Sequence, residues 1–368
     1  MPKIQDTFHV SVIAEAGVNH NGKLNLALSL VDAAADAGAD VVKFQTFRAD
    51  QLATSLAKQA AYQARNTGVE TSQLDMLRGL ELDDDAHHRL VAHCRARRIA
   101  FLSTPFDDTS LRLLVDGLGL KRLKIGSGDL TNWPMLYAIA QRQCEVIVST
   151  GMATMKEIED ALSVLAFAYT VEGAPDRDKF QRAFNSSDGK AALQANVTLL
   201  HCTSDYPAID SEINLRAMDT LAAAFSLTVG LSDHSEGISI AIGAAARGAA
   251  VIEKHLTLDR SMSGPDHIAS IEPNDFAAMV EGIRKIERAL GDGRKVPMPS
   301  ELKTMPVARK SLAARVAIRR GEAFTEDNVC IKRPGNGMSP GLYWDLIGRT
   351  ATRDYTTDES LDEKLTPP

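Results

Sequence analysis

Residues 226–255 read SLTVGLSDHSEGISIAIGAAARGAAVIEKH, and this stretch decides the fold that we expect for the chain. It contains two short apolar runs, Ser226–Leu231 and Ala249–Ile252, which are typical of buried β-strands. Between them, residues 237–248 are rich in Ala and Ile and have the length of a helix. A strand, a crossover helix and a second strand form one unit of a parallel sheet.

A histidine follows each apolar run, His234 after the first and His255 after the second. Because the carboxyl ends of parallel strands meet at one rim, we expect the two imidazoles to lie close together. Imidazole suits borderline divalent metals, and a site with only two protein ligands leaves positions for water and substrate oxygens. The spacing is equally compatible with hydrogen-bonded histidines that hold no metal.

The alternation of strand and helix continues along most of the chain, about eight times, which predicts an α/β fold of the (β/α)8 TIM-barrel type. We expect this catalytic barrel over residues 1–292. Residues 293–305 have the composition of a linker, and residues 306–368 predict a small, β-rich domain with a limited core of its own.

Composition limits the classes of partner. The 368 residues carry a net charge of −7, which argues against nucleic acid or an anionic membrane surface as the main partner. The four cysteines are widely spaced without a Cys-x-x-Cys pair, which indicates a reducing compartment. No signal-peptide pattern and no apolar run of the about 18 residues that span a membrane is present. We expect a soluble cytoplasmic protein.

Polar side chains mark the ends of the first two predicted strands. Glu15 ends the first, and Lys43 and Gln45 lie two residues apart in the second, so they share one face. A lysine inside an apolar strand indicates a functional face rather than plain core. Glu15 is the best candidate for a general acid or base.

Hydroxyl and glycine residues follow the next three strands, with Thr104, Ser127 and Ser149 as the candidate ligands. Backbone N–H groups and helix N-termini in such turns can receive phosphate oxygens. Together with Lys43 and Lys124, these turns favour a clamp for an anion. A Schiff-base nucleophile on one of the two lysines is the alternative.

Three further histidines, His87, His88 and His93, fall in a predicted helix that is rich in acidic and basic residues. They could suggest a metal cluster, but a solvated helix face is the interpretation that we prefer.

The segments around these residues form a series along the chain. They read IAEAGVNHNG (13–22), VKFQT (42–46), STPF (103–106), KIGSG (124–128), STGM (149–152), SDH (232–234), EKH (253–255), GPD (264–266) and KRPGNG (332–337). In this order they resemble the sialic acid synthase family. The last segment resembles the signature of that family's C-terminal antifreeze-like (SAF, β-clip) domain.

The resemblance implies condensation of phosphoenolpyruvate with an N-acetylated six-carbon sugar such as N-acetylmannosamine, giving a nine-carbon sialic acid and phosphate. His234 and His255 would hold a divalent metal, Mn2+ with Mg2+ or Co2+ as alternatives, against the aldehyde oxygen of the open-chain sugar. Glu15 would handle the water that attacks the cationic intermediate. Residues that match the phosphoenolpyruvate ligands are Lys43, Lys124, Ser127 and Ser149, and those that match the sugar ligands are Gln45, Asn66, Tyr206, Asp266 and Arg333.

The sugar is less defined than the reaction. An N-acetylneuraminate synthase is our first expectation. The alternative is an N,N'-diacetyllegionaminate synthase that uses 2,4-diacetamido-2,4,6-trideoxymannose, and a pseudaminate synthase or a Schiff-base lyase ranks below both. Asp129, a candidate catalytic residue, stands where the family usually has glutamate, and Ser204 stands where some members have asparagine. The resemblance also implies a homodimer in which the antifreeze-like domain, with Arg333, covers the partner's barrel.

Overall fold

The computed structural model describes residues 8–59, 63–64, 66 and 71–364. The chain divides into two compact units, Met1–Gly291 and Asp292–Pro368, and each is described by itself.

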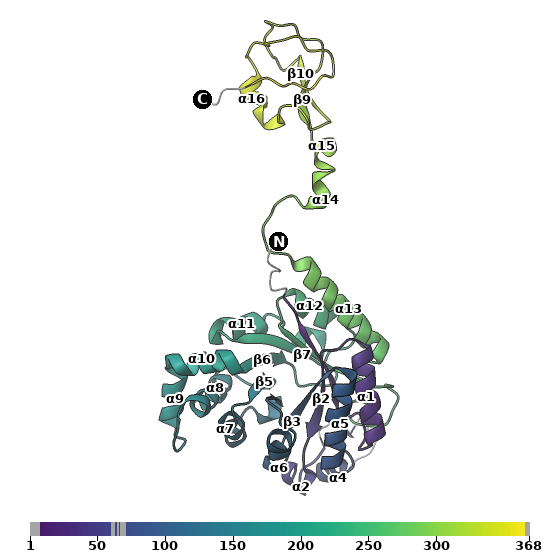
Figure 1. Cartoon of the computed structure of the whole chain (residues 1–368), viewed down its shortest axis with the longest axis vertical. Helices are drawn as coiled ribbons and strands as arrows, with labels where there is room; N and C mark the ends of the chain where they lie inside the picture. The colour runs from purple at the N-terminus through teal and green to yellow at the C-terminus, as the bar shows by residue number, and fades with distance from the viewer. Residues whose placement is uncertain (1–7, 60–62, 65, 67–70, 365–368) are drawn as a thin grey trace. The chain divides into compact units, whose positions relative to one another are not determined.

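The first unit is an eight-stranded parallel barrel enclosed by helices, as Figure 1 shows. The neighbouring strands follow the order β3-β2-β1-β8-β7-β6-β5-β4, and β3 and β4 lie next to one another at the seam. The sequence-based prediction of a (β/α)8 barrel is therefore confirmed. The strands are β1 (Ser11–Gly17), β2 (Val41–Thr46), β3 (Ala100–Pro105), β4 (Arg122–Ile125), β5 (Glu145–Ser149), β6 (Val197–Cys202), β7 (Thr228–Asp233) and β8 (Val251–His255).

Helices connect successive strands and cover the outside of the barrel (Figure 1). Their starts follow capping chemistry: Asp83 accepts from the backbone N–H of Ala86, and Thr154 with Glu157 forms a capping box. The covering helices are α1 (Leu24–Asp36), α5 (Asp84–Arg97), α6 (Asp108–Arg112), α7 (Trp133–Gln141), α8 (Met155–Thr170), α9 (Arg177–Asn185), α10 (Ser187–Asn196), α11 (Ala217–Phe225), α12 (Ser239–Ala246) and α13 (Pro273–Leu290).

The barrel interior is layered. A buried apolar cluster fills its middle and consists of Ile13, Val41, Leu102, Ile147, Leu200 and Val251. Because side chains repeat every two residues on one face of a strand, the next inward layer comes two residues later. That layer is polar and contains Glu15, Lys43, Thr104, Ser149 and Glu253, all buried. The apolar layer therefore lies directly beneath the polar layer and supports it.

The two strands that carry the histidines end later than predicted. Both β7 and β8 begin and end about two residues beyond the apolar runs, so Asp233 and His255 belong to strands. The parallel ladder pairs Ser232 with Glu253 and Asp233 with Lys254. The polar ends of the strands keep the sheet geometry because their backbone hydrogen bonds continue across the ladder.

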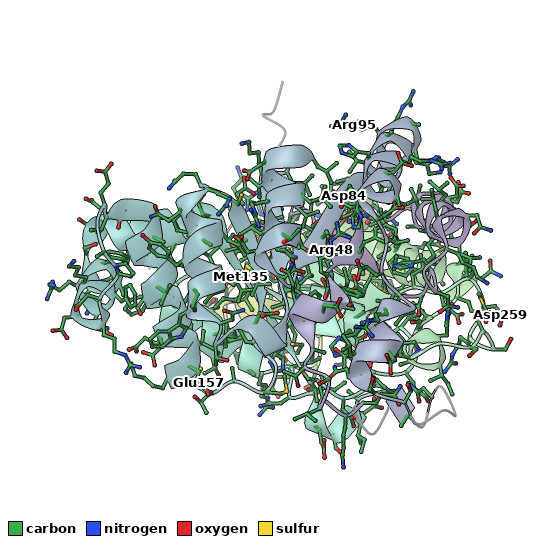
Figure 2. The ribbon with its side chains drawn as sticks, turned by 90° about the horizontal axis from the view of Figure 1, so that it is seen from below. Arg48, Asp84, Arg95, Met135, Glu157 and Asp259 are labelled. Atoms are coloured by element: carbon green, nitrogen blue, oxygen red, sulfur yellow. The ribbon has the colours of Figure 1, made fainter. Side chains whose placement is uncertain are left out.

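Between β2 and α5, the described part of the chain includes the short helices α2 (Ala49–Leu52) and α4 (Gln73–Arg78). Arg48, at the start of this segment, forms ion pairs with Glu81 and Asp84 (Figure 2). The backbone N–H of Arg48 also donates to Asp107, 2.7 Å away. These contacts tie both ends of the segment to the barrel.

The solvated-face interpretation of the histidines in α5 is wrong for one of them. His87 is buried, and its Nε2 lies 3.0 Å from the hydroxyl of Thr46 in β2. His88 is exposed, and His93 pairs with Asp32 at 2.8 Å. The inner face of α5 thus gives the buried hydroxyl of Thr46 a second partner beside the hydroxyl of Ser103, 2.7 Å away.

The second unit contains an antiparallel pair, β9 (Ser311–Ala314) and β10 (Val329–Lys332), with short helices α14 (Pro299–Leu302), α15 (Met305–Ala308) and α16 (Tyr343–Leu346). Its own core is more developed than predicted, because Leu312, Phe324, Leu346, Tyr355 and Leu361 are all fully buried. In the described part of the chain, no helix is long and apolar enough to cross a membrane.

Candidate active site

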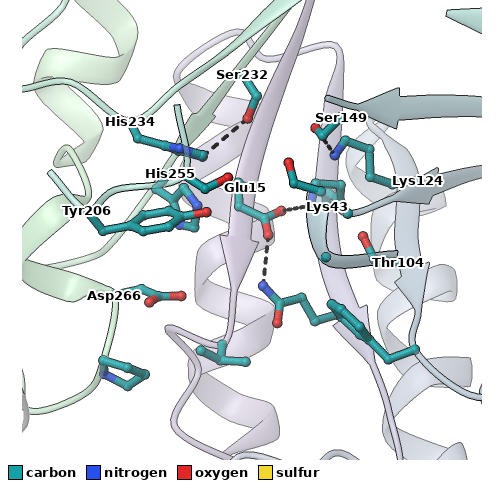
Figure 3. A pocket seen from close by; sticks show the side chains of 18 of the residues that line it. Glu15, Lys43, Thr104, Lys124, Ser149, Tyr206, Ser232, His234, His255 and Asp266 are labelled. Atoms are coloured by element: carbon teal, nitrogen blue, oxygen red, sulfur yellow. Dashed lines mark hydrogen bonds and ion pairs between the residues drawn. The ribbon is translucent and has the colours of Figure 1, made fainter. Parts of the chain in front are cut away.

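A cavity of about 570 Å³ opens at the carboxyl ends of the barrel strands. In parallel barrels this end carries the active site. Figure 3 shows side chains from several strands converging on it. The predicted site residues that line it are Glu15, Lys43, Gln45, Thr104, Lys124, Ser127, Ser149, Tyr206, His234, His255 and Asp266.

Lys43 lies between two carboxylates. Its Nζ is 2.7 Å from Glu15 and 3.8 Å from Glu253. Strand register explains the first pair, because Glu15 of β1 is aligned with Lys43 of β2. Burial disfavours the charge on Lys43, but Glu15 and Glu253 outweigh it and raise the pKa of the ammonium. Lys43 is therefore a fixed cation.

Lys124, from β4, forms the second cation. Its Nζ donates to Ser149 at 2.6 Å and lies 3.6 Å from Glu253. Burial lowers the pKa of Lys124, and the attraction of Glu253 offsets this only in part. A second negative group in the cavity would favour the charged form of this lysine.

Glu253 joins the two halves of the site. It lies near both lysines, and Oε1 accepts from the hydroxyl of Ser232 at 2.9 Å. Burial opposes ionisation, but Lys124 and Lys43 lower the pKa of Glu253 to about 2. From the sequence, Glu253 is a candidate for proton transfer or for binding sugar hydroxyls, with a supporting role beside His255 as the alternative. Its position two residues before His255 on the same strand face was the signal for a place in the cavity.

A set of hydroxyl and amide groups lies next to Lys124. The backbone N–H of Gly151 donates to Ser127 Oγ at 3.0 Å, and Cys202 Sγ lies 3.2 Å from the same oxygen. Gly151 has no alternative here, since a Cβ at this position would lie 2.2 Å from the hydroxyl of Ser204. Small groups thus keep an anion-sized space open beside the lysine.

The histidines meet as predicted, with ring centroids 5.5 Å apart (Figure 3). Nδ1 of His234 lies 2.6 Å from the carbonyl oxygen of Thr203. A carbonyl only accepts, so Nδ1 carries the proton, and Nε2, 3.3 Å from the hydroxyl of Ser232, is unprotonated and carries a lone pair. Burial lowers the pKa of both imidazoles, and the proximity of His234 lowers that of His255 further. Both rings are therefore neutral near pH 7.

These features fit a divalent metal. Neutral imidazoles are the required ligand form, and the Thr203 carbonyl fixes the ring of His234 as outer partners of metal-bound histidines do. His255 contributes a buried Nδ1 for which the described part of the chain provides no hydrogen-bond partner. Among the described residues, no group of three or more His, Cys, Asp or Glu side chains is placed to hold a metal. A metal at the histidines would leave its other positions to water and substrate.

An aromatic ring and polar side chains near the histidines can contact a polar organic ligand. The ring of Tyr206 lies 4.2 Å from that of His234 and 5.6 Å from that of His255, centroid to centroid. Gln45 donates to Glu15 at 3.3 Å. Burial, and then the nearby Glu15, raise the pKa of Asp266 to about 7. A carboxyl with that pKa can donate as well as accept a hydrogen bond.

Three predicted site residues do not line the cavity. Asp129 lies just beyond Ser127, and its carboxylate accepts from Asn132 at 3.1 Å. Asn66 donates to the carbonyl of Pro265 at 2.8 Å, beside the cavity. Arg333 belongs to the second unit, where it is exposed and its Nε donates to the carbonyl of Ala308 at 2.9 Å.

Comparison with known proteins agrees with this geometry. A family model described as the NeuB family matches residues 30–295. N,N'-diacetyllegionaminic acid synthase of Campylobacter jejuni is 48% identical over 96% of this chain and 98% of that protein. The protein of the same name from Legionella pneumophila is 39% identical over 95% of this chain and 92% of its own length. The crystal structure of an N-acetylneuraminic acid (sialic acid) synthetase from Leptospira borgpetersenii has a TM-score of 0.64 and 34% identity, covering 80% of this chain and 90% of that one. With its sequence, its barrel and its cavity in agreement, the chain belongs to the NeuB family.

Proposed function

We propose that the barrel condenses phosphoenolpyruvate with the aldehyde of an open-chain N-acylated sugar. One observation carries the proposal: two buried lysines and a row of hydroxyl groups share a cavity with two neutral histidines. The first set suits a phosphorylated carboxylate, and the second suits a metal that polarises a carbonyl oxygen.

Phosphoenolpyruvate would lie against Lys43, Lys124, Ser127 and Ser149. The lysines provide fixed charge, and the hydroxyl groups provide hydrogen bonds without adding negative charge. The anion would give Lys124 a further negatively charged partner. The charged form of Lys124 is less favoured than that of Lys43, because the pKa of Lys124 is lowered and that of Lys43 is raised. When no anion is bound, the negative charge of Glu253 offsets the repulsion between the two lysines.

The carbon–carbon bond forms when C3 of phosphoenolpyruvate attacks C1 of the sugar. The C2–C3 π electrons become the new bond, the carbonyl π electrons move to the aldehyde oxygen, and C2 becomes an oxocarbenium centre. A divalent metal at His234 and His255, Mn2+ by the resemblance, would act as the Lewis acid for that oxygen. The chain's own contribution is to hold C3 and C1 in contact inside a buried site.

Water then adds to the cationic C2 with loss of one proton, and the new C2 hydroxyl loses its proton as phosphate leaves, which gives the 2-keto group. Of these two protons, one is needed by the alkoxide on C1 and the other by the departing phosphate. Glu15 is the candidate that takes the proton from this water, as sequence reasoning predicted. Burial raises the pKa of Glu15 although its ion pair with Lys43 opposes the shift. A carboxylate with a raised pKa is a better base, because its affinity for the proton is higher.

For the sugar, we favour 2,4-diacetamido-2,4,6-trideoxymannose over N-acetylmannosamine. Two relatives, at 48% and 39% identity over nearly the whole chain, are named N,N'-diacetyllegionaminic acid synthases. This reverses the order that sequence reasoning alone preferred. The antifreeze-like identity of residues 306–368 and a swapped homodimer that brings Arg333 to the partner's barrel also stay proposals.

The test is phosphate release from phosphoenolpyruvate across a panel of N-acylated hexoses with Mn2+ present. We expect release only with a sugar that can open to an aldehyde, and most with the diacetamido sugar. Phosphate release without any sugar, or none with every sugar, would contradict the proposal. Borohydride reduction with pyruvate checks the Schiff-base alternative, and a covalent adduct on Lys124 together with activity that survives EDTA would support the lyase.

A further inference from the structure

One wall of the cavity is aliphatic. Its side chains belong to a compact apolar cluster that is separate from the barrel core and also contains Phe47, Ala49 and Leu74. We call this surface the aliphatic wall, and it consists of Val18, Leu52, Met76, Leu77 and Leu80.

The aliphatic wall is more than the inside of a small core. Val18, Leu77 and Leu80 are buried, but Leu52 and Met76 are only partly buried and complete the surface towards the cavity. A reactive site for charged groups does not require such a surface. Sites that bind small organic molecules are usually lined by apolar side chains, with a few polar groups that fix the orientation of the ligand.

Strand order places the aliphatic wall on the sugar side of the site. Its residues follow β1 and β2, and β1 is the neighbour of β8, which carries His255. Asn66 donates to the carbonyl of Pro265, so this segment is tied to the loop that carries Asp266. Of the proposed phosphate-binding groups, Ser149 of β5 lies across the barrel from β1, whereas Lys124 and Ser127 come from the end of β4, two strands from β2. A sugar chain that leaves the histidines on this side meets the aliphatic wall.

Amide side chains accompany the apolar ones. Gln73 and Gln63 line the cavity beside Met76 and Leu77. An acetamido substituent has the matching pair of surfaces, a methyl group for the aliphatic side and an amide for hydrogen bonds. A C6 methyl group needs only the aliphatic side.

We propose that the aliphatic wall is the subsite for the deoxygenated, N-acylated far end of the sugar, its C6 methyl and C4 acetamido methyl groups. The inference rests on the proposed function, since it takes the aldehyde to lie at the histidines. A sugar with hydroxyl groups at C4 and C6 gives up hydrogen bonds to water there without replacement. The wall therefore selects diacetamido trideoxy sugars against N-acetylmannosamine.

The experiment compares kcat/KM for the two sugars in wild type, Met76→Gln and Val18→Thr. Each change keeps the approximate shape of the side chain and adds polarity. One added or lost apolar contact of this kind shifts discrimination about 10-fold or more. We expect the ratio of kcat/KM, diacetamido sugar over N-acetylmannosamine, to fall about 10-fold in each variant. Met155→Gln is the matched control, because Met155 is exposed and does not line the cavity.

The outcomes separate the two proposals. If both sugars lose kcat/KM equally, the aliphatic wall contacts the shared C2 acetamido group and the inference is wrong. Variants in which neither sugar's kcat/KM changes also overturn it. If wild type releases phosphate with neither sugar, the proposed function itself fails, and the inference fails with it. Thermal unfolding checks that each variant folds, and Leu52→Gln, at a partly buried position, replaces any that does not.

Discussion

This barrel contains two kinds of buried lysine, on different strands. Lys254 of β8 is fully enclosed, and its Nζ donates to Asp233 at 2.7 Å and to the carbonyl of Ser235 at 2.6 Å. Lys43 and Lys124 are just as buried, yet both line the cavity. The strand period explains the separation, since Lys254 points away from the face that carries Glu253 and His255.

The difference lies in how completely each group is hydrogen-bonded. Asp233 also accepts from the N–H and the hydroxyl of Ser235, so its pair with Lys254 is closed. In the cavity, Oε2 of Glu253 has no hydrogen-bond partner among the residues that the structure describes and lies 3.8 Å from Lys43. A closed buried pair fixes structure, whereas an open one keeps charge available for a ligand.

We call three charged residues that line the cavity, Lys43, Lys124 and Glu253, the open set. The largest expected effect comes from a substitution in this set. Lys124→Met removes the cation that bonds Ser149 and faces the proposed anion. We expect kcat/KM to fall about 1,000-fold, about 4 kcal/mol, because charged contacts to a transferring phosphate site are worth that much. The thermal midpoint should stay within a few degrees of wild type, and steady-state phosphate release measures the loss. Activity within tenfold of wild type would contradict an anion clamp.

A substitution in the closed pair, Asp233 and Lys254, should instead lower the free energy of unfolding. Lys254→Met leaves Asp233 buried without its cation, which costs about 3 kcal/mol or more of the free energy of unfolding. Urea unfolding at neutral pH measures the change. Asp233→Asn combined with Lys254→Met should recover part of the loss, because no uncompensated charge remains. If Lys254→Met unfolds like wild type, the closed pair does not hold the strand ends.

Glu253 belongs to the open set, and Glu253→Gln tests its influence on the lysines. We expect kcat/KM to fall about 100-fold. The change also removes the negative charge that favours protonated Lys124, so the pKa of that lysine should fall further. The alkaline limb of the kcat/KM profile should therefore move to lower pH. A lower rate with an unmoved alkaline limb would indicate a purely steric role.

This comparison also shows where sequence reasoning succeeds and where it stops. Alternation of strand and helix predicted the barrel, and the rule that parallel strands share a carboxyl rim predicted the meeting of His234 and His255. The same reasoning could not rank Glu253 and Asp233, two carboxylates next to histidine motifs. The strand period places Glu253 on the face of His255, and the structure shows that Glu253 lines the cavity whereas Asp233 pairs with Lys254.

Contacts made by residues outside the barrel strands were the second feature that the sequence did not predict. The aliphatic wall comes from Val18, Leu52, Leu80 and two residues of α4, which lie far apart in the sequence, and of these only Val18 falls in a motif segment. His87 shows the same limit, because its charged neighbours in α5 suggested solvent while its own side reaches Thr46. Burial of one residue on a polar helix depends on the strand behind it, which periodicity of a weakly amphipathic helix does not reveal.

A smaller effect is expected from pH. The pKa of Asp266 is raised by burial to about 7, above its unfolded value, so the folded state holds this proton more tightly. The contribution to stability is complete below about pH 4 and is lost as pH rises towards 7. Asp266→Asn lacks this dependence. Urea unfolding of the two metal-free proteins between pH 4 and 8 should show wild type losing stability relative to the variant, and parallel curves would contradict the raised pKa.

The smallest effect is expected at Asp129, which the family resemblance marked as a catalytic candidate. Its carboxylate bonds Asn132 at the start of α7 and does not line the cavity. Asp129→Asn keeps an acceptor oxygen for that bond, so we expect kcat/KM to change less than about tenfold. Glu15→Gln is the contrast within the same site, because a base that takes a proton contributes about 100-fold or more. If both variants lose activity equally, Asp129 reaches the reacting atoms through a rearrangement of the turn after β4, and the open set extends further than its hydrogen bonds indicate.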